Sequence, residues 1–310
     1  MKAIVIEQYG GSDQLIEKEL PIPDINDNQV LIEMHATSIN PIDWKVREGY
    51  MKDAMPFDFP LILGWDAAGV VSEVGSKVTQ FKKGDKVFAR PAMENGTYSE
   101  YVAVDEDLVA LKPDSLSFEE AAAVPLAGLT AWQCVVDFGQ VKKGDKVLIQ
   151  AGSGGVGSYA IQIAKNFGAT VYSTASSKNE AFLKELGVDE FIDYKTTDFT
   201  DVAKDVDLVV DTMGGDILEK SMDVVKKGGR LVSIAGEPDA EKAKEKGITA
   251  ESLWLNPNGK QLAELGQLIE DGKVKPHIGH TYPLTEQGLR DAHDLSATHH
   301  AKGKIVITIR

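Results

Sequence analysis

Short apolar or alternating runs, separated by turns, fill the first third of the chain. Alternation with a period of two is typical of half-buried β-strands, and Lys-Gly-Asp at 83–85 is a turn signal. No helix dominates this region. We therefore expect it to be β-rich up to about residue 115, with strands at residues 3–6, 30–34, 68–74 and 86–89.

From about residue 120 the pattern changes, because strand-like apolar runs alternate with helical stretches that end near residues 167, 186 and 225. This alternation indicates βαβ crossovers and a parallel sheet. An amphipathic helix follows at 259–269, and a last strand at 304–309 can rejoin the first region. The predicted strands of the alternating region are 146–150, 170–173, 190–192, 208–211 and 230–234.

The composition is that of a folded protein with an acidic surface. The 310 residues are 43% hydrophobic and 26% charged, which is enough apolar material for two ordinary domains. Thirty-three Lys and Arg against 48 Asp and Glu give a net charge of −15. That charge repels phosphate backbones and anionic lipids, so we expect neither nucleic acid nor membrane as a partner.

The cysteine count and the hydropathy indicate the compartment of the protein and whether it spans a membrane. The single cysteine, Cys134, allows neither an intrachain disulfide nor a Cys-rich zinc site, which fits the cytoplasm best. The first residues are too briefly apolar for a signal peptide. The longest uncharged run, 147–164, contains four glycines, two serines and two glutamines, so it is a poor membrane span.

The strongest motif joins the first strand of the alternating region to its helix. Val-Leu-Ile-Gln at 147–150 leads into Ala-Gly-Ser-Gly-Gly-Val-Gly at 151–157 and then into a helical stretch. Such a loop turns tightly, lets its backbone approach a pyrophosphate and ends at unpaired helical N–H donors. A glycine-rich turn without a ligand is the alternative. The predicted dinucleotide contacts are Gly152, Gly154, Gly155, Val156 and Gly157.

About twenty residues further on, no carboxylate stands where NAD-binding proteins place one for the ribose hydroxyl. Ser176, Ser177 and Lys178 follow the second strand instead. Their size and charge suit a 2′-phosphate, so NADP is predicted over NAD. Tyr194, after the third strand, can stack on adenine or bind the same phosphate. The alternatives are a solvated lysine and a plain surface tyrosine.

Several motifs in order along the chain resemble the medium-chain dehydrogenase/reductase superfamily, and within it the zinc-free, zeta-crystallin-like quinone and enone oxidoreductases. The motifs are Ser-Ile-Asn-Pro-Ile-Asp-Trp at 38–44 with Arg47 and Gly49, Leu-Gly-Trp-Asp-Ala-Ala-Gly-Val-Val at 63–71, Val-Gly at 74–75, Gly-Asp-Lys-Val at 84–87, residues 96–100, Gly-Leu-Thr-Ala at 128–131, the glycine loop and Gly-Lys-Ile-Val at 303–306.

The resemblance implies an α/β fold in which a doubly wound Rossmann sheet is inserted in a GroES-like β-barrel domain, with the active site between the two. It implies a GroES-like catalytic domain over 1–120, completed by 257–310, and a Rossmann NADP-binding domain over 121–256. It also implies further cofactor contacts, and Trp254 is expected to cover the nicotinamide ring. These further contacts are Thr130, Ala235, Trp254 and Lys304.

The resemblance also bears on metal binding. Zinc-dependent relatives place their ligands at positions that are Asn40, the Gly-Trp-Asp triplet at 64–66 and the Leu-Ala pair at 126–127 here, and none of these offers a thiolate or an imidazole. The six histidines fall elsewhere, and Cys134 is expected to be a small core residue. We therefore predict NADP(H) as the cofactor, without zinc.

Candidate substrate contacts lie in and near the 38–44 motif. The resemblance places Asn40 and Asp43 near the nicotinamide, where an amide can donate to a carbonyl oxygen that gains charge. Asn-Pro-Ile-Asp at 40–43 is also typical of a helix start, with proline at N1 and an acid at N3, and both roles can coexist. Tyr50 and Trp65 are expected to line a site for a flat unsaturated substrate, with core packing as the alternative.

Three functions are compatible with these residues. The first is an NADPH-dependent reductase that transfers hydride to a quinone or another conjugated carbonyl, with Tyr50 or solvent as proton donor. The second is an enone or enal double-bond reductase, to which the stretches 40–45 and 256–259 are somewhat more similar. The third is an NADPH-binding sensor or structural protein with little turnover. A homodimer is expected from the resemblance alone.

Overall fold

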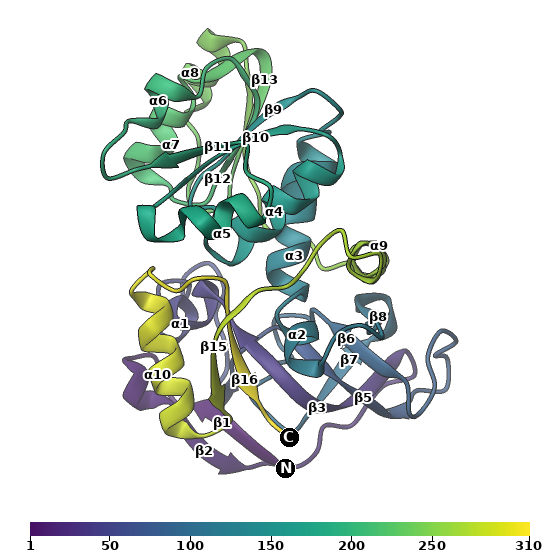
Figure 1. Cartoon of the computed structure of the whole chain (residues 1–310). Helices are drawn as coiled ribbons and strands as arrows, with labels where there is room; N and C mark the ends of the chain where they lie inside the picture. Colours follow the sequence, from purple (N-terminus) through teal and green to yellow (C-terminus); the bar gives the residue numbers. More distant parts are fainter. The chain divides into compact units, whose positions relative to one another are not determined.

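Mostly antiparallel strands build the first of two units, which comprises Met1–Leu129, Pro257–Gly272 and Pro276–Arg310. The computed structural model describes residues 1–310 (Figure 1). The strands of this unit are β1 (Lys2–Ile6), β2 (Ile16–Glu19), β3 (Gln29–Ile39), β4 (Leu61–Ile62), β5 (Ala67–Val74), β6 (Lys86–Ala89), β7 (Tyr101–Asp105), β8 (Val109–Leu111), β15 (Ile278–Pro283) and β16 (Lys304–Thr308).

Two sheets organise these strands. The larger has the order β15-β16-β3-β5-β6-β8, with β7 also paired to β3, and the smaller has the order β2-β1-β4. Strand β16 pairs antiparallel with β3, so the end of the chain does rejoin the first region. The helices of this unit are η1 (Ser12–Gln14), α1 (Pro41–Arg47), η2 (Glu106–Leu108), α2 (Phe118–Ala122), α9 (Gly259–Glu270) and α10 (Glu286–Ala297).

A parallel six-stranded sheet builds the second unit, Thr130–Asn256 with Lys273–Lys275. Its strands are β9 (Lys146–Ile149), β10 (Thr170–Ala175), β11 (Glu190–Asp193), β12 (Val206–Asp211), β13 (Val225–Ser233) and β14 (Thr249–Ser252). Their order, β11-β10-β9-β12-β13-β14, reverses between β9 and β12. In such sheets ligands bind outside the carboxyl ends of the strands, near the point of reversal.

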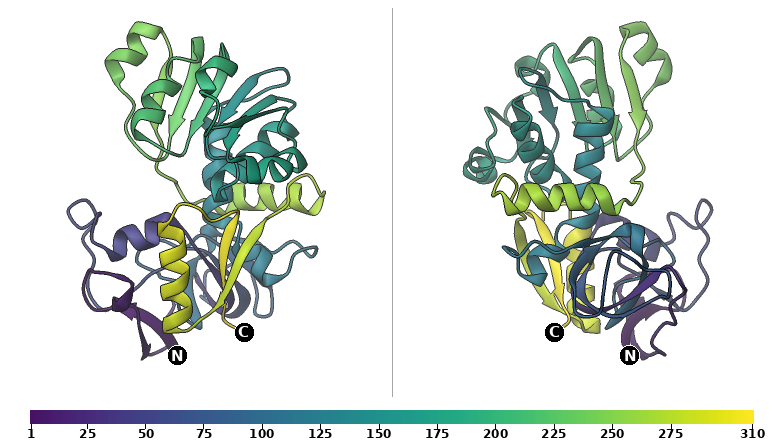
Figure 2. Two further views of the ribbon diagram at one scale, coloured as in Figure 1. Left: turned by 60° about the vertical axis from the view of Figure 1, so that its left-hand side comes forward. Right: turned by 90° about the vertical axis from the view of Figure 1, so that its right-hand side faces the viewer.

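Helices cover both faces of this parallel sheet (Figure 2). They are α4 (Gly155–Asn166), η4 (Ser177–Asn179), α5 (Glu180–Glu185), α6 (Phe199–Val202), α7 (Gly215–Ser221) and α8 (Ala240–Lys246), preceded by the π-helical turn η3 (Gln133–Phe138). Helix α3 (Pro125–Trp132) crosses the boundary between the two units. The predicted α/β class with a parallel sheet is confirmed.

The sequence pattern missed β14, β15 and α10. Strand β14 is the edge of its sheet and its residues, Thr-Ala-Glu-Ser, are mostly exposed, so they carry no apolar alternation. Strand β15 is also an edge strand with mostly exposed side chains. Helix α10 buries small and polar residues beside Leu289, and one of them is His293.

No helix in the chain combines the length and apolar character needed to cross a bilayer.

Candidate cofactor and substrate sites

The glycine loop connects β9 to α4 at the carboxyl end of the parallel sheet. A Cβ atom on Gly152 would lie 2.1 Å from Ser173 Oγ, and one on Gly157 would lie 2.6 Å from the Ala151 carbonyl oxygen. Both glycines are therefore required by the packing of the loop itself. A Cβ on Gly154 would meet only the Ala151 oxygen, at 3.4 Å. The open side of Gly154 thus leaves room for a ligand to approach the backbone.

The start of α4 offers hydrogen-bond donors to such a ligand. Gly154 is the N-cap of α4 and has no side chain with which to satisfy the first helical N–H groups. The loop before it is held in place, because the Ala151 and Gly152 N–H groups donate to Thr174 Oγ1 and to the Thr174 carbonyl oxygen, both at 3.0 Å. Fixed, uncapped N–H groups at a helix N-terminus fit a pyrophosphate.

The residues after β10 suit a second phosphate. Lys178 lies in η4, is exposed, and its ammonium makes no hydrogen bond or ion pair. Ser176 is buried at the N-cap of the same turn. The Asn179 amide donates to Ser153 Oγ at 3.1 Å, which ties this turn to the glycine loop. The structure therefore brings the two predicted phosphate-binding segments together in one unit.

The remaining predicted cofactor residues of the second unit follow neighbouring strands. Tyr194 comes directly after β11 and is 54% exposed, and Trp254 comes two residues after β14 and is 58% exposed. Ala235 follows β13 and its N–H donates to Ser233 Oγ at 3.1 Å. Thr130 is buried in α3. Because parallel strands end at the same edge, the glycine loop, Lys178, Tyr194, Ala235 and Trp254 share that edge.

A cluster of buried polar side chains occupies the first unit. Strand register explains it, because β16 pairs Ile305 with Ile39 of β3, and β3 pairs Ala36 with Ala68 of β5. Continuing both registers brings Lys304, Asn40 and Asp66 to one end of the sheet. Asp66 accepts from Ser38 Oγ at 2.5 Å, from Asn40 Nδ2 at 2.7 Å and from the Leu126 N–H at 2.6 Å.

Lys304, which the resemblance places at the cofactor, is bonded within this cluster. Its ammonium donates to the Ile39 carbonyl oxygen at 3.0 Å and to Asn40 Oδ1, and it lies 3.4 Å from Asp66 Oδ2. An ammonium has three N–H donors, and three acceptors surround this one. The side chain is 4% exposed. Within the first unit the Lys304 ammonium is therefore already bonded to protein acceptors.

Asn40 and Asp43 form a capping box at the start of α1. The Asp43 carboxylate accepts from the Asn40 N–H at 2.8 Å and from Tyr98 OH at 2.8 Å. Both residues are buried, and both polar groups of the Asn40 amide are bonded to Asp66 and Lys304. This geometry supports the helix-start role of both residues.

Burial has electrostatic consequences in this cluster. It raises the pKa of Asp43 to about 7, against the lowering effect of the hydrogen bonds from Asn40 and Tyr98. Arg90, after β6, is also buried, and burial lowers its pKa. Asp43 Oδ1 and Arg90 Nε have no hydrogen-bond partner. Sequence reasoning missed Arg90, Asp66, Tyr98 and His293, because polarity alone does not reveal burial.

The two aromatic candidates of this unit differ. Trp65 has no exposed surface and its indole donates to the Met93 carbonyl oxygen at 2.9 Å, which favours the alternative of core packing. Tyr50 follows α1, is 70% exposed, and packs edge-on against Trp44 with 6.1 Å between ring centroids. Its hydroxyl makes no hydrogen bond. Tyr50 alone among the predicted substrate residues presents a free polar group.

No three His, Cys, Asp or Glu side chains gather in a way that could hold a metal ion. Of the positions that the resemblance compares with zinc ligands, those of Asn40, Trp65 and Asp66 carry the buried side chains described above, and the third is the Leu-Ala pair at 126–127. Cys134 is fully buried in the second unit, and burial raises the pKa of its thiol to about 12.

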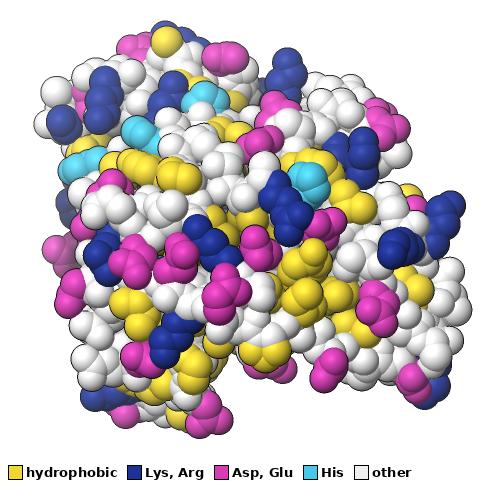
Figure 3. Space-filling view, turned by 90° about the horizontal axis from the view of Figure 1, so that it is seen from below, with side chains coloured by type: hydrophobic (Ala, Val, Ile, Leu, Met, Phe, Trp, Pro, Cys, Tyr) yellow, Lys and Arg dark blue, Asp and Glu magenta, His cyan; other side chains and the backbone are white.

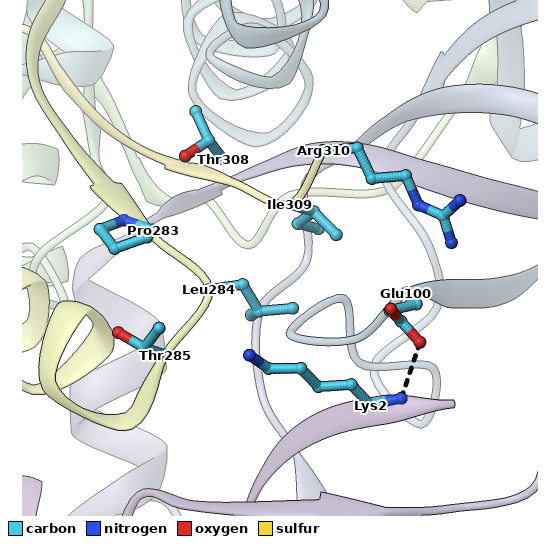
Figure 4. Close-up of a pocket in the computed structure, with 8 residues that line it drawn as sticks. All are labelled: Lys2, Glu100, Pro283, Leu284, Thr285, Thr308, Ile309 and Arg310. Carbon is cyan, nitrogen blue, oxygen red and sulfur yellow. Dashed lines mark hydrogen bonds between the residues drawn. The ribbon is translucent and has the colours of Figure 1, made fainter.

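A separate pocket of about 320 Å³ lies in the first unit (Figure 4). It is lined by Lys2, Glu100, Pro283, Leu284, Thr285, Thr308, Ile309 and Arg310. Its cations already have partners, because Lys2 pairs with Glu17 at 3.0 Å and Arg310 with Glu33. None of the predicted site residues lines it.

On the face shown in Figure 3, basic and acidic side chains are interspersed rather than segregated.

The similarity to known proteins extends over nearly the whole chain. Residues 26–114 match the alcohol dehydrogenase GroES-like domain, and residues 186–307 match a family described as zinc-binding dehydrogenase. A 2-methylene-furan-3-one reductase from Solanum lycopersicum is 40% identical over 99% of this chain and 79% of its own length. An NADPH-dependent alkenal/one oxidoreductase from Arabidopsis thaliana, chloroplastic, is 38% identical with the same coverage.

A solved structure of similar sequence has the same fold. The quinone oxidoreductase from Coxiella burnetii is 40% identical, with a TM-score of 0.90, over 100% of this chain and 99% of its own. The matches define an oxidoreductase that joins a GroES-like domain to a Rossmann-like sheet, and the predicted fold class is confirmed. The chain belongs to the quinone oxidoreductase branch of the medium-chain dehydrogenase/reductase superfamily.

Proposed function

We propose that this protein uses NADPH to reduce a conjugated carbonyl compound or a quinone. The observation that carries the proposal is the carboxyl edge of the parallel sheet, where uncapped N–H groups, open space at Gly154 and the unpaired Lys178 ammonium lie in one unit. Relatives of both substrate classes, similar over nearly the whole chain, support the reaction type.

The residues of the second unit would bind and orient the cofactor. The first N–H groups of α4 would hold the pyrophosphate, and Gly154 would let the phosphate oxygens approach. Lys178 and Ser176 would bind the 2′-phosphate by charge-assisted hydrogen bonds. Tyr194 would lie beside the adenosine and Trp254 against the nicotinamide. When bound, NADPH supplies the hydride.

The first unit would provide substrate contacts. Tyr50 is proposed to pack against the unsaturated substrate and to provide the proton that follows the hydride, because its ring is exposed and its hydroxyl is free. Asn40 and Asp43 are proposed to shape α1 rather than to touch the substrate, since both side chains are buried and the Asn40 amide is bonded at both of its polar atoms. The reaction is proposed to need no zinc.

Steady-state NADPH oxidation with a panel of quinones, enones and enals tests the proposal. We expect turnover with at least one class, at lower efficiency with NADH, and no loss after prolonged chelation. Tyr50→Phe should lower kcat without weakening NADPH binding. Tight NADPH binding with no turnover on any acceptor would favour the sensor or structural function instead.

Reduction of the carbon–carbon double bond of enones and enals is the more specific candidate. Two relatives at 38–40% identity are named for such substrates, although the Coxiella protein is named a quinone oxidoreductase. Product analysis separates the two: a saturated ketone or aldehyde indicates an enone reductase, and a hydroquinone indicates a quinone reductase.

A further inference from the structure

Four buried side chains of the first unit form an unbroken hydrogen-bond chain. Tyr98 OH lies 2.8 Å from Asp43 Oδ2 and 3.0 Å from His293 Nε2, and His293 Nδ1 lies 3.2 Å from an Arg47 guanidinium nitrogen. None of the four is more than 2% exposed. The chain joins α10, which carries His293, to both ends of α1, where Asp43 is at N3 and Arg47 is in the last turn.

The chemistry of the donors fixes the direction of every bond. A guanidinium has no acceptor, so Arg47 must donate to His293 Nδ1. His293 is then neutral, with its proton on Nε2, and it donates to the Tyr98 oxygen. The Tyr98 hydroxyl is left to donate to Asp43. Burial, and after it the charge of Arg47, lower the pKa of His293 to about 3, which agrees with a neutral ring.

This chain cannot conduct protons to Asp43, because Arg47 closes its far end with a group that does not give up its proton. What it can do is hold geometry. Arg47 is anchored further by a bond from its Nε to the Gly10 carbonyl oxygen at 3.1 Å and by a pair with Glu48. Helix α1 has only seven residues. His293 of α10 contacts Arg47 at its end directly and Asp43 at its start through Tyr98, so both ends of α1 are held.

We propose that His293, held as its Nε2-protonated tautomer by Arg47, is a positioning residue that acts through Tyr98 on Asp43 and so places α1 and the adjoining Tyr50 for reduction of the substrate. The proposal rests on the proposed function for its effect on catalysis. The charged groups near Asp43 outside the chain are Lys304, Asp66 and Arg90, and Arg47 is the charged group that faces His293.

Matched substitutions test this role. In His293→Gln the amide oxygen can accept from Arg47 and the amide nitrogen can donate to Tyr98, whereas His293→Leu can do neither. We expect kcat, measured with an acceptor that the wild type reduces, to fall about ten- to a hundredfold in His293→Leu and to stay within about threefold in His293→Gln. His300→Leu, at an exposed histidine of the same terminal segment, is the control and should match the wild type.

The pH profile separates positioning from simple stability. Tyr98→Phe removes a donor from the Asp43 carboxylate and so raises its pKa. Because the proposal makes the ionised Asp43 the group that places α1, kcat should have an acid limb that moves upward by about one pH unit in Tyr98→Phe and stays in place in His293→Gln. A purely structural role predicts a lower melting temperature for His293→Leu with unchanged kcat and pH profile in the folded protein. That outcome would overturn the proposal.

The tautomer of His293 can be measured directly, without an assay of enzyme activity. Long-range ¹H–¹⁵N correlation spectra of the histidine side chains should show one ring with protonated Nε2 and bare Nδ1 that does not titrate down to about pH 5. An Nδ1-protonated ring or an imidazolium at neutral pH would refute the inference. If no acceptor is reduced by the wild type, the proposed function fails while this measurement still decides the hydrogen-bond chain.

Discussion

The two predicted sites differ in whether their polar groups already have partners. In the first unit Asp66, Asn40, Lys304 and Asp43 are buried and bonded to one another. In the second unit the first N–H groups of α4 and the Lys178 ammonium are without protein partners.

Residues that a family resemblance suggests can therefore be separated by whether their polar groups are already bonded within the protein. Polar groups that are buried and mutually bonded stabilise the fold, and removing one leaves another without its partner. Polar groups that are fixed by the backbone yet unpaired are available to a ligand.

The largest effect is expected at Lys304. Lys304→Met leaves the buried Asp66 carboxylate without its ammonium and should cost about 3–5 kcal/mol of unfolding free energy, measured by urea denaturation. Lys246→Met removes one partner of an exposed ion pair with Asp223 and should change stability by less than about 1 kcal/mol. A stable Lys304→Met protein that binds NADPH weakly would instead favour Lys304 as a cofactor contact.

Lys178 should show the opposite behaviour. Lys178→Ala removes a charge-assisted contact with the 2′-phosphate and should weaken NADPH binding by about 1.5–3 kcal/mol, or roughly ten- to a hundredfold, in titration calorimetry. NADH affinity and melting temperature should hardly change. Lys184→Ala, on the following helix, is the control. Equal losses for both nucleotides would remove Lys178 from the phosphate site.

Asn40→Asp should separate the capping role from the buried cluster. Aspartate caps a helix about as well as asparagine, so capping alone predicts no change. In the cluster, however, the new carboxylate replaces a donor 2.7 Å from Asp66, which should cost about 1–3 kcal/mol or more. The loss should shrink as pH falls and one carboxylate takes up a proton. Urea denaturation at two pH values checks this, and an unaltered stability would contradict the buried contact.

Asp43 and His293 should make opposite contributions to the pH dependence of stability. Folding raises the pKa of Asp43 from 3.8 to about 7 and lowers that of His293 from 6.5 to about 3. Between about pH 4 and 6.5 the folded chain therefore has one more proton on Asp43 and one fewer on His293 than the unfolded chain, so the two effects cancel.

Single substitutions should expose the two slopes. Relative to the wild type, the unfolding free energy of Asp43→Asn should rise with pH, because only the unfolded state protonates His293. That of His293→Gln should fall with pH, because only the folded state protonates Asp43. Each slope should reach about 1.4 kcal/mol per pH unit. Parallel curves for both variants in urea titrations would contradict the assignment.

The smallest effect on stability is expected at Gly154. A Cβ there meets only Ala151 oxygen at 3.4 Å, so Gly154→Ala should change the unfolding free energy by less than about 1 kcal/mol while weakening NADPH binding by about tenfold. Gly152→Ala is the contrasting variant, because its Cβ would meet Ser173 Oγ at 2.1 Å and should cost about 1–3 kcal/mol. Unchanged NADPH affinity in Gly154→Ala would argue against the pyrophosphate site.

The sequence predicted the parallel sheet and the position of the glycine loop, because both depend on local patterns of apolar residues and glycines. It could not predict that Lys304 bonds to Asn40, since those residues are 264 positions apart and meet only through the register of β16 and β3. It also gave His293 no role. Its partners, Arg47 and Tyr98, come from distant segments, and the helix that carries it has only two large apolar residues, Leu289 and Leu295.

The burial of Cys134 matters for a protein proposed to handle quinones and enones. Such compounds are electrophiles that alkylate thiolates, and the thiolate is the reactive form of cysteine. Burial raises the pKa of the Cys134 thiol to about 12 and leaves it no exposed surface, so the thiol stays protonated at neutral pH. Because the chain contains no other cysteine, it carries no exposed thiol that such compounds could readily alkylate.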